Sequence, residues 1–107
     1  MSRRISHSDV FAAIADPTRR AILECLGGGE KPVLEVAGAF PITLSAISQH
    51  MRVLRDAGLV TVRKVGRERF YALEPTPLKE VADWVQFYER FWSNRLEALG
   101  NYLEEKE

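Results

Sequence analysis

Four polar side chains recur at the spacing of one helix face between residues 43 and 60. They stand at i, i+3, i+4 and i+7 and are Ser45, Ser48, Gln49 and Arg52. Two hydroxyls, an amide and a guanidinium are groups that hydrogen-bond to base edges and phosphates in the major groove of DNA. The chemistry that this spacing favours is therefore recognition of double-stranded DNA.

The same segment carries the signals of a helix with a buried side. Ile47, Met51 and Leu54 form an apolar stripe away from the polar one. Thr43 is a favourable N-cap, and Gly58 favours a left-handed turn at the other end. An ordinary solvated helix would also show a polar face, so the neighbouring elements must decide between the two interpretations.

The chain ahead of this segment predicts three helices, over residues 7–15, 17–26 and 32–40. Asp16 is a good N-cap and Pro17 a favoured first residue for the second of them. Two helices joined by a turn of about four residues form a helix-turn-helix, whose second helix is the usual groove reader. The third helix and the polar helix have this arrangement.

A β-hairpin is predicted after the polar helix. Residues 59–65 alternate in polarity and favour a strand, and residues 68–73 return after a tip at Gly66-Arg67. Such a wing can place cations on backbone phosphates or in a minor groove. The four cations predicted to do so are Arg63, Lys64, Arg67 and Arg69.

The net charge of zero, from 15 basic and 15 acidic residues, argues at first against a nucleic-acid partner. The distribution of that charge argues for one. Residues 43–73 hold six basic and two acidic residues, a net charge of +4, whereas residues 74–107 hold four basic and eight acidic residues, a net charge of −4. The positive charge thus lies in the predicted DNA reader, although a basic solvated face would look the same.

A long amphipathic helix is predicted from residue 78 to 102 or beyond, and we assign 78–104 to dimerisation. Its apolar residues form two rows, more than the core of a small domain can cover. Burial against a second copy is the favoured interpretation; packing on the chain's own core and a small-molecule pocket are the alternatives. The residues predicted at the dimer interface are Phe11, Trp84, Tyr88, Phe91, Trp92, Leu96 and Leu99.

Three segments closely resemble the ArsR-type winged helix-turn-helix transcriptional regulators. They are AIADPTRRAILECL (13–26), LSAISQHMRVLRDAGLV (44–60) and VGRERFYAL (65–73), and the resemblance extends over nearly the whole chain. It implies a homodimer formed through the first and last helices, with two recognition helices on a roughly palindromic operator.

The resemblance also implies roles for single residues. The side chains of the polar stripe would face the major groove, and the hairpin cations would approach the flanking backbone. We add Thr43 to the recognition-helix set. Arg19 occupies a recurrent position of the family; it is either a phosphate contact or a solvated side chain, and we favour the contact.

The chain departs from the metal-sensing members of that family. Residues 31–40 contain no cysteine or histidine, the last helix contains no histidine, and Cys25 is the only cysteine. Soft divalent metals need several such ligands at helix spacing, and His7, Cys25 and His50 are scattered. We therefore expect a branch of the family without metal-binding motifs, with no cofactor. We also expect a core thiol at Cys25 and a packed, hydrogen-bonded imidazole at His50.

These features predict a mainly α fold with a small β-hairpin, an α+β winged helix-turn-helix. It would have about five helices and a two-stranded wing in one domain over residues 1–107. The predicted function is DNA-binding transcriptional regulation by a homodimeric repressor that occludes a promoter. A protein-interaction module and a metal-responsive repressor with a non-standard site are the alternatives.

Other function classes find little support. No Ser/His/Asp set, carboxylate pair or phosphate-binding glycine loop suggests an enzyme. No apolar run approaches the roughly 20 residues of a membrane span, and the first residues lack a secretory signal. We expect a cytoplasmic protein whose partners are operator DNA, a second copy, and an unknown inducer or partner protein.

Overall fold

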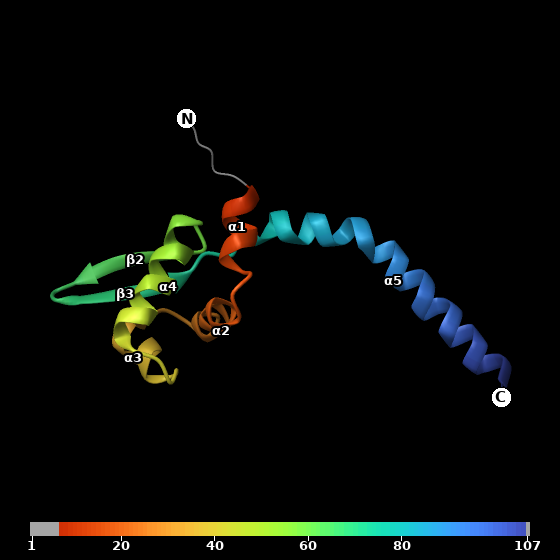
Figure 1. Ribbon diagram of the computed structural model, residues 1–107, viewed down its shortest axis with the longest axis horizontal. Helices are drawn as coiled ribbons and strands as arrows, with labels where there is room; N and C mark the ends of the chain where they lie inside the picture. The colour runs from red at the N-terminus through yellow and green to blue at the C-terminus, as the bar shows by residue number, and fades with distance from the viewer. Residues whose placement is uncertain (1–6, 107) are drawn as a thin grey trace.

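A computed structural model describes residues 7–106, apart from the side chains of residues 7–9, 95–98, 102 and 104–106. Five helices and three strands follow one another along these residues (Figure 1). Their bounds are α1 His7–Ala13, α2 Pro17–Leu26, β1 Lys31–Pro32, α3 Val33–Gly38, α4 Leu44–Asp56, β2 Val60–Val65, β3 Glu68–Leu73 and α5 Leu78–Lys106. The predicted mainly α class with a small sheet is confirmed.

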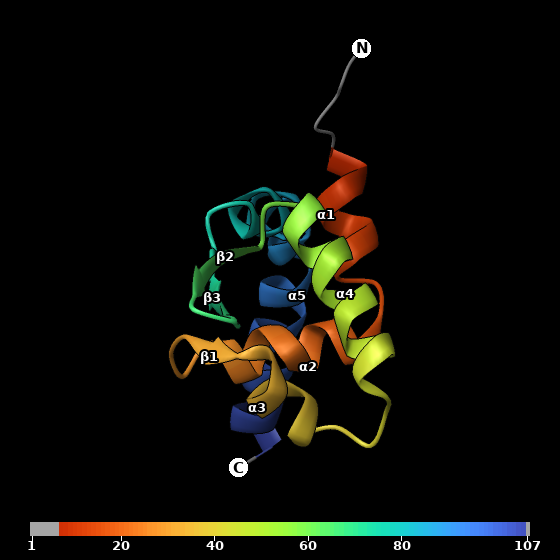
Figure 2. The same cartoon turned by 90° about the vertical axis from the view of Figure 1, so that its left-hand side faces the viewer.

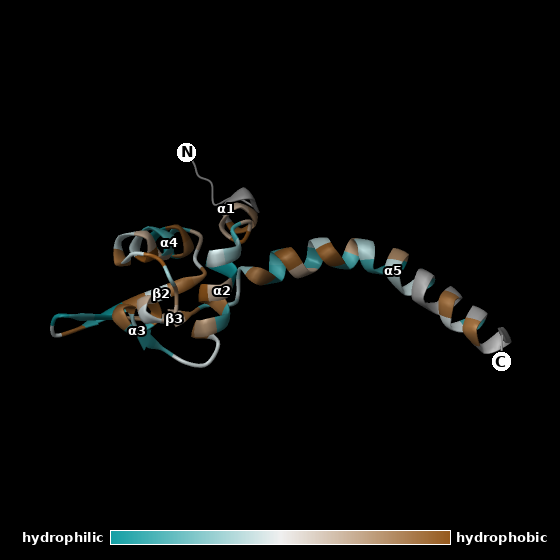
Figure 3. Cartoon of the chain, turned by 60° about the horizontal axis from the view of Figure 1, so that its bottom comes forward, coloured by the Kyte–Doolittle hydropathy of each residue, from teal (hydrophilic) through white to brown (hydrophobic). Residues whose placement is uncertain are grey.

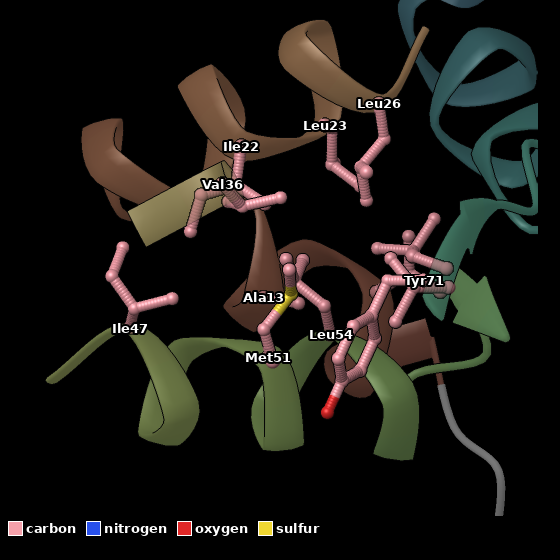
Figure 4. Close-up of a cluster of buried hydrophobic side chains, with 12 residues drawn as sticks. Ala13, Ile22, Leu23, Leu26, Val36, Ile47, Met51, Leu54 and Tyr71 are labelled. Carbon is pink, nitrogen blue, oxygen red and sulfur yellow. The ribbon is translucent and has the colours of Figure 1, made fainter. Parts of the chain in front are cut away.

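The core lies between α4, α2, α3 and the sheet (Figures 2 and 4). Ile47, Met51 and Leu54 point from α4 toward α2 and are at most 1% exposed. Ile22 and Leu26 of α2 meet them there and are 0% and 2% exposed. Because burying these stripes stabilises the fold only in this orientation, the polar side of α4 must face outward.

Both ends of α4 have the hydrogen bonds that its sequence predicts. At the start, the Thr43 hydroxyl accepts a hydrogen bond from the Ala46 amide at 3.0 Å. At the end, Gly58 has a φ of 78°, its amide donates to Arg55, and the Leu59 amide donates to Leu54, each at 2.9 Å. This pair of bonds is the Schellman arrangement, which needs a left-handed residue after the helix.

The sheet has three strands in the order β1-β3-β2, one more than the two-stranded wing predicted from the sequence. The wing itself pairs in antiparallel register, from Val60 opposite Leu73 to Val65 opposite Glu68. The additional strand consists only of Lys31 and Pro32, opposite Tyr71 and Phe70. Two residues that include a proline carry no strand signal, and proline is tolerated there because β1 is an edge strand.

The long helix α5 leaves the body of the molecule on the side away from the wing (Figure 1). Its first turns pack on α1, where the rings of Phe11 and Trp84 meet edge to face with centroids 5.5 Å apart. Within the described residues, no helix is both long enough and apolar enough to cross a membrane.

Candidate nucleic-acid interface

The polar face of α4 is open to a ligand. The side chains of Ser45, Ser48, Gln49 and Arg52 are all exposed. They occupy one side of a helix whose opposite side is in the core, which is the arrangement of a helix that inserts into a groove. Thr43 is also exposed, but its hydroxyl already caps the helix.

One flank of this face borders the wing. A cavity of about 140 Å³ opens between α4 and β3. Its lining residues are Ser48, Met51, Arg52, Arg55, Arg69 and Tyr71. Arg55 was not among the residues predicted from the sequence, although it lies three positions after Arg52 and seven after Ser48, on the same flank.

The four predicted wing cations do not have equal environments. Lys64 and Arg69 lie opposite each other on β2 and β3, and they are exposed together with Arg67 near the tip. Figure 3 shows this end of the hairpin as mostly hydrophilic. Arg63 instead donates two hydrogen bonds to the carboxylate of Glu30, at 2.7 and 2.8 Å.

The Arg63 guanidinium also lies over the Phe70 ring, 5.3 Å from its centroid. The paired hydrogen bonds raise the pKa of Arg63 and hold that of Glu30 below its ordinary value. The charge of Arg63 is therefore largely balanced within the fold. A DNA phosphate would have to compete with Glu30 for it, which sets Arg63 apart from the other three cations.

The predicted phosphate contact Arg19 has partners inside the protein. Its Nε donates to the Ala13 carbonyl at 2.7 Å, and its Nη2 donates to the Ala12 carbonyl at 3.3 Å. Both acceptors lie at the C-terminal end of α1, whose last carbonyls have no partner within the helix. Arg20 donates in the same way to Ile14, at 2.7 Å.

Arg19 also reaches α4, since its Nη1 lies 3.1 Å from Nδ1 of His50. A guanidinium only donates hydrogen bonds, so Nδ1 accepts and the imidazole proton must be on Nε2. The predicted hydrogen-bonded role of His50 is thereby confirmed. The Arg19 guanidinium thus links α1 to α4, while its predicted phosphate contact stays a prediction.

The Asp16 carboxylate stabilises the start of α2, next to the contacts of Arg19. It accepts a hydrogen bond from the Arg19 amide at 3.0 Å and caps the start of α2. That hydrogen bond lowers the pKa of Asp16 below its ordinary value. The segment from Asp16 to Arg20 therefore ends one helix, begins the next and contacts the recognition helix.

An aromatic face runs along α5 with little covering it. Its large side chains are between 38% and 55% exposed; they are Trp84, Tyr88, Phe91, Trp92 and Leu99. Figure 3 shows hydrophobic segments recurring along the helix. Phe11 is half-buried against this face, and the side chain of Leu96 lies outside the described residues. The alternative in which these side chains pack on the chain's own core is wrong for those that the structure describes.

Metal-ligating side chains do not gather among the residues that the structure describes, where no group of three or more His, Cys, Asp or Glu residues is placed to hold an ion. Cys25 is half-buried on α2 instead of fully enclosed. The expectation of a regulator without a metal site stays a prediction.

Comparison with known proteins finds a helix-turn-helix family model and relatives named as transcriptional regulators. A family model described as a helix-turn-helix domain matches residues 14–63. The HTH-type transcriptional regulator Rv2034 of Mycobacterium tuberculosis is 38% identical over 104 residues, which are 97% of this chain and 94% of that protein. The transcriptional repressor SdpR of Bacillus subtilis is 36% identical over 78 residues, which are 73% of this chain and 87% of SdpR.

A solved structure supplies the family name. The crystal structure of the ArsR family transcriptional regulator RHA00566 has a TM-score of 0.74 and 34% sequence identity, covering 87% of this chain and 97% of its own. The chain belongs to the ArsR family. It is a DNA-binding transcriptional regulator with a winged helix-turn-helix fold, and these ArsR-type relatives are regulators by name, none of them an enzyme.

A second ArsR-type structure bears on assembly. The homodimeric winged helix-turn-helix DNA-binding domain Mb0332 from Mycobacterium bovis has a TM-score of 0.63 and 28% identity, covering 78% of this chain and 77% of its own. That domain is described as a possible ArsR-family transcriptional regulator. The ArsR-type resemblance seen in the sequence is thus confirmed in both sequence and fold.

Proposed function

We propose that this ArsR-family regulator is a homodimeric repressor that binds a palindromic operator and blocks access to a promoter. The observation that carries the proposal is the exposed polar face of α4 beside cations that have no carboxylate partner among the described residues. The similarity to a named repressor, SdpR, supports repression over activation. We place the protein in the cytoplasm, in contact with the chromosome.

The aromatic face of α5 supports a homodimer. Large apolar side chains exposed in a row along a helix mark a protein interface, because leaving them in water costs free energy. A two-fold dimer covers the same patch on both copies. It also presents two recognition helices, which match half-sites about 34–36 Å apart. The homodimeric Mb0332 domain is consistent with this assembly.

The proposal divides the interface into two kinds of contact. The outward side chains of α4 would read base edges, with Gln49 suited to a bidentate contact with adenine. Lys64, Arg67 and Arg69 would bind phosphates, which sets affinity and salt dependence more than sequence choice. Recovering bound sequences from random DNA tests the proposal, since a palindromic consensus is expected and its absence would contradict operator recognition.

Replacing Gln49 with alanine should relax the base preference at one operator position. The loss on operator DNA should be about 1–3 kcal/mol, the value of a bidentate base contact, with little change on random DNA. Fluorescence anisotropy on both DNAs measures the difference. Gln86→Ala is the matched control, an exposed glutamine on α5. An equal loss on operator and random DNA would remove Gln49 from the base readers.

Replacing Arg67 with alanine should weaken operator and random DNA alike. The slope of log affinity against log salt should flatten by about 0.9, the value for one phosphate contact. Arg63→Ala is the matched control, because Glu30 already balances its charge; the slope should change less. Titrations over a series of salt concentrations measure both slopes. Equal slopes for the two variants would contradict the distinction between the cations.

A further inference from the structure

Three guanidinium-bearing residues line the small cavity between α4 and the wing. Arg52 and Arg55 stand one turn apart on α4, and Arg69 comes from β3. Ser48 lines the cavity from the turn before Arg52. The buried Tyr71 lies against α4 beside Met51 (Figure 4). The rigid core thus holds together the two elements that carry the arginines.

These arginines differ from the others whose interactions the structure describes. Arg63 pairs with Glu30, and Arg19 and Arg20 bind the carbonyl groups at the end of α1. Arg52, Arg55 and Arg69 have no carboxylate partner within the described residues, and no acidic residue lines their cavity. Three like charges at one cavity repel one another, so an anion bound among them would be stabilised by all three.

The geometry limits the size and kind of that anion. About 140 Å³ is several times the roughly 30 Å³ of a water molecule in the liquid, which suits a group the size of a phosphate. Guanidinium groups bind phosphate oxygens through paired hydrogen bonds, and a serine hydroxyl can donate one more. The cavity also adjoins the reading face of α4, where a DNA backbone would pass toward the wing.

We propose that the cavity holds a single phosphodiester of the operator backbone, bound by Arg52 and Arg55 from α4 and by Arg69 from β3. The proposal rests on the DNA binding proposed above and refines it. It makes Arg55 a phosphate-binding residue and assigns Arg52 to the backbone instead of to a base edge. The helix and the wing then share one phosphate in each half-site.

The test combines Arg55→Gln and Arg69→Gln with operators in which one phosphate at a time is an uncharged methylphosphonate. Each arginine variant should weaken binding to the natural operator by about ten- to hundredfold, the value of a charge-assisted hydrogen bond. At one phosphate of each half-site, the methylphosphonate should weaken DNA binding by the wild-type protein. It should reduce the affinity of both variants much less. Such non-additivity marks a direct contact.

Lys79→Gln removes one exposed charge from α5 and is the matched control; it should show additive losses at every phosphate. Thermal unfolding checks that each variant is folded. Coupling of Arg55 and Arg69 to different phosphates, or to none, overturns the shared site while leaving DNA binding intact. So does binding of free inorganic phosphate at Arg55, seen by NMR, without coupling to any backbone position. A wild-type protein that binds no DNA in a salt-dependent way would overturn the proposed function as well.

Discussion

Replacing Trp92 with glutamate should convert the dimer into a monomer and weaken operator binding by about 10²–10⁴-fold, the avidity that linking two binding sites provides. Trp92 is 53% exposed in the single chain, so its replacement leaves the core of each protomer intact. A carboxylate within an apolar interface must lose its water without gaining a partner, and a second copy brings the same charge close by.

Sedimentation analysis and operator titration measure the two parts of this result. Gln86→Glu is the control, since residues two positions apart point to opposite sides of a helix and Gln86 is thus away from Tyr88. It adds the same charge and should leave a dimer with unchanged affinity. The monomeric variant should still bind an isolated half-site as the wild type does. If the Trp92→Glu protein remained dimeric, the dimer interface would have to lie elsewhere on the molecule.

Replacing Arg19 with alanine should lower the free energy of unfolding by about 1.5–3 kcal/mol, because a charged hydrogen-bond donor is lost from three acceptors. For a domain of this size, the melting temperature should fall by roughly 6–20 °C. Operator affinity should fall as well, since His50 loses the contact that ties α4 to α1. Arg19→Lys should recover little of the lost stability, because one ammonium group cannot reproduce the hydrogen bonds of the planar guanidinium.

Thermal unfolding at a fixed protein concentration measures the effect, because the stability of a dimer depends on concentration. Arg20→Ala is the control; it removes one exposed hydrogen bond to Ile14 and should cost no more than about 1 kcal/mol. If Arg19→Ala changed the salt slope of DNA binding and left stability unchanged, Arg19 would be a phosphate contact after all.

The recognition helix could be predicted closely from sequence because local signals agree with one another. The cap at Thr43, the apolar stripe of Ile47 and Leu54, and the left-handed glycine at residue 58 each act within a few positions. Helix period, cap and stop are short-range features, so they survive in the sequence as a readable pattern. The exposed row on α5 was predictable for the same reason.

The remaining features depend on residues far apart in the chain. Arg63 and Glu30 are 33 positions apart, and Arg19 and His50 are 31 apart. Whether a cation is free for DNA or paired depends on tertiary contacts that no local pattern records. The edge strand β1 was missed because two residues are too few to show a period. Arg55 was missed because its proposed role depends on the wing, which lies beside it only in the folded structure.

The length of α5 has a mechanical consequence. Its 29 residues span ~43 Å, and the helices and strands of the winged helix-turn-helix lie at one end of it (Figure 1). A tilt of about 5° between two such helices moves the far end by about 3.8 Å, close to the axial rise of one base pair. In the proposed dimer, a small rotation at the subunit contact would therefore move the two recognition helices out of register with the DNA. An inducing signal that tilts the helices of such a dimer would release the operator without separating the subunits or unfolding either of them.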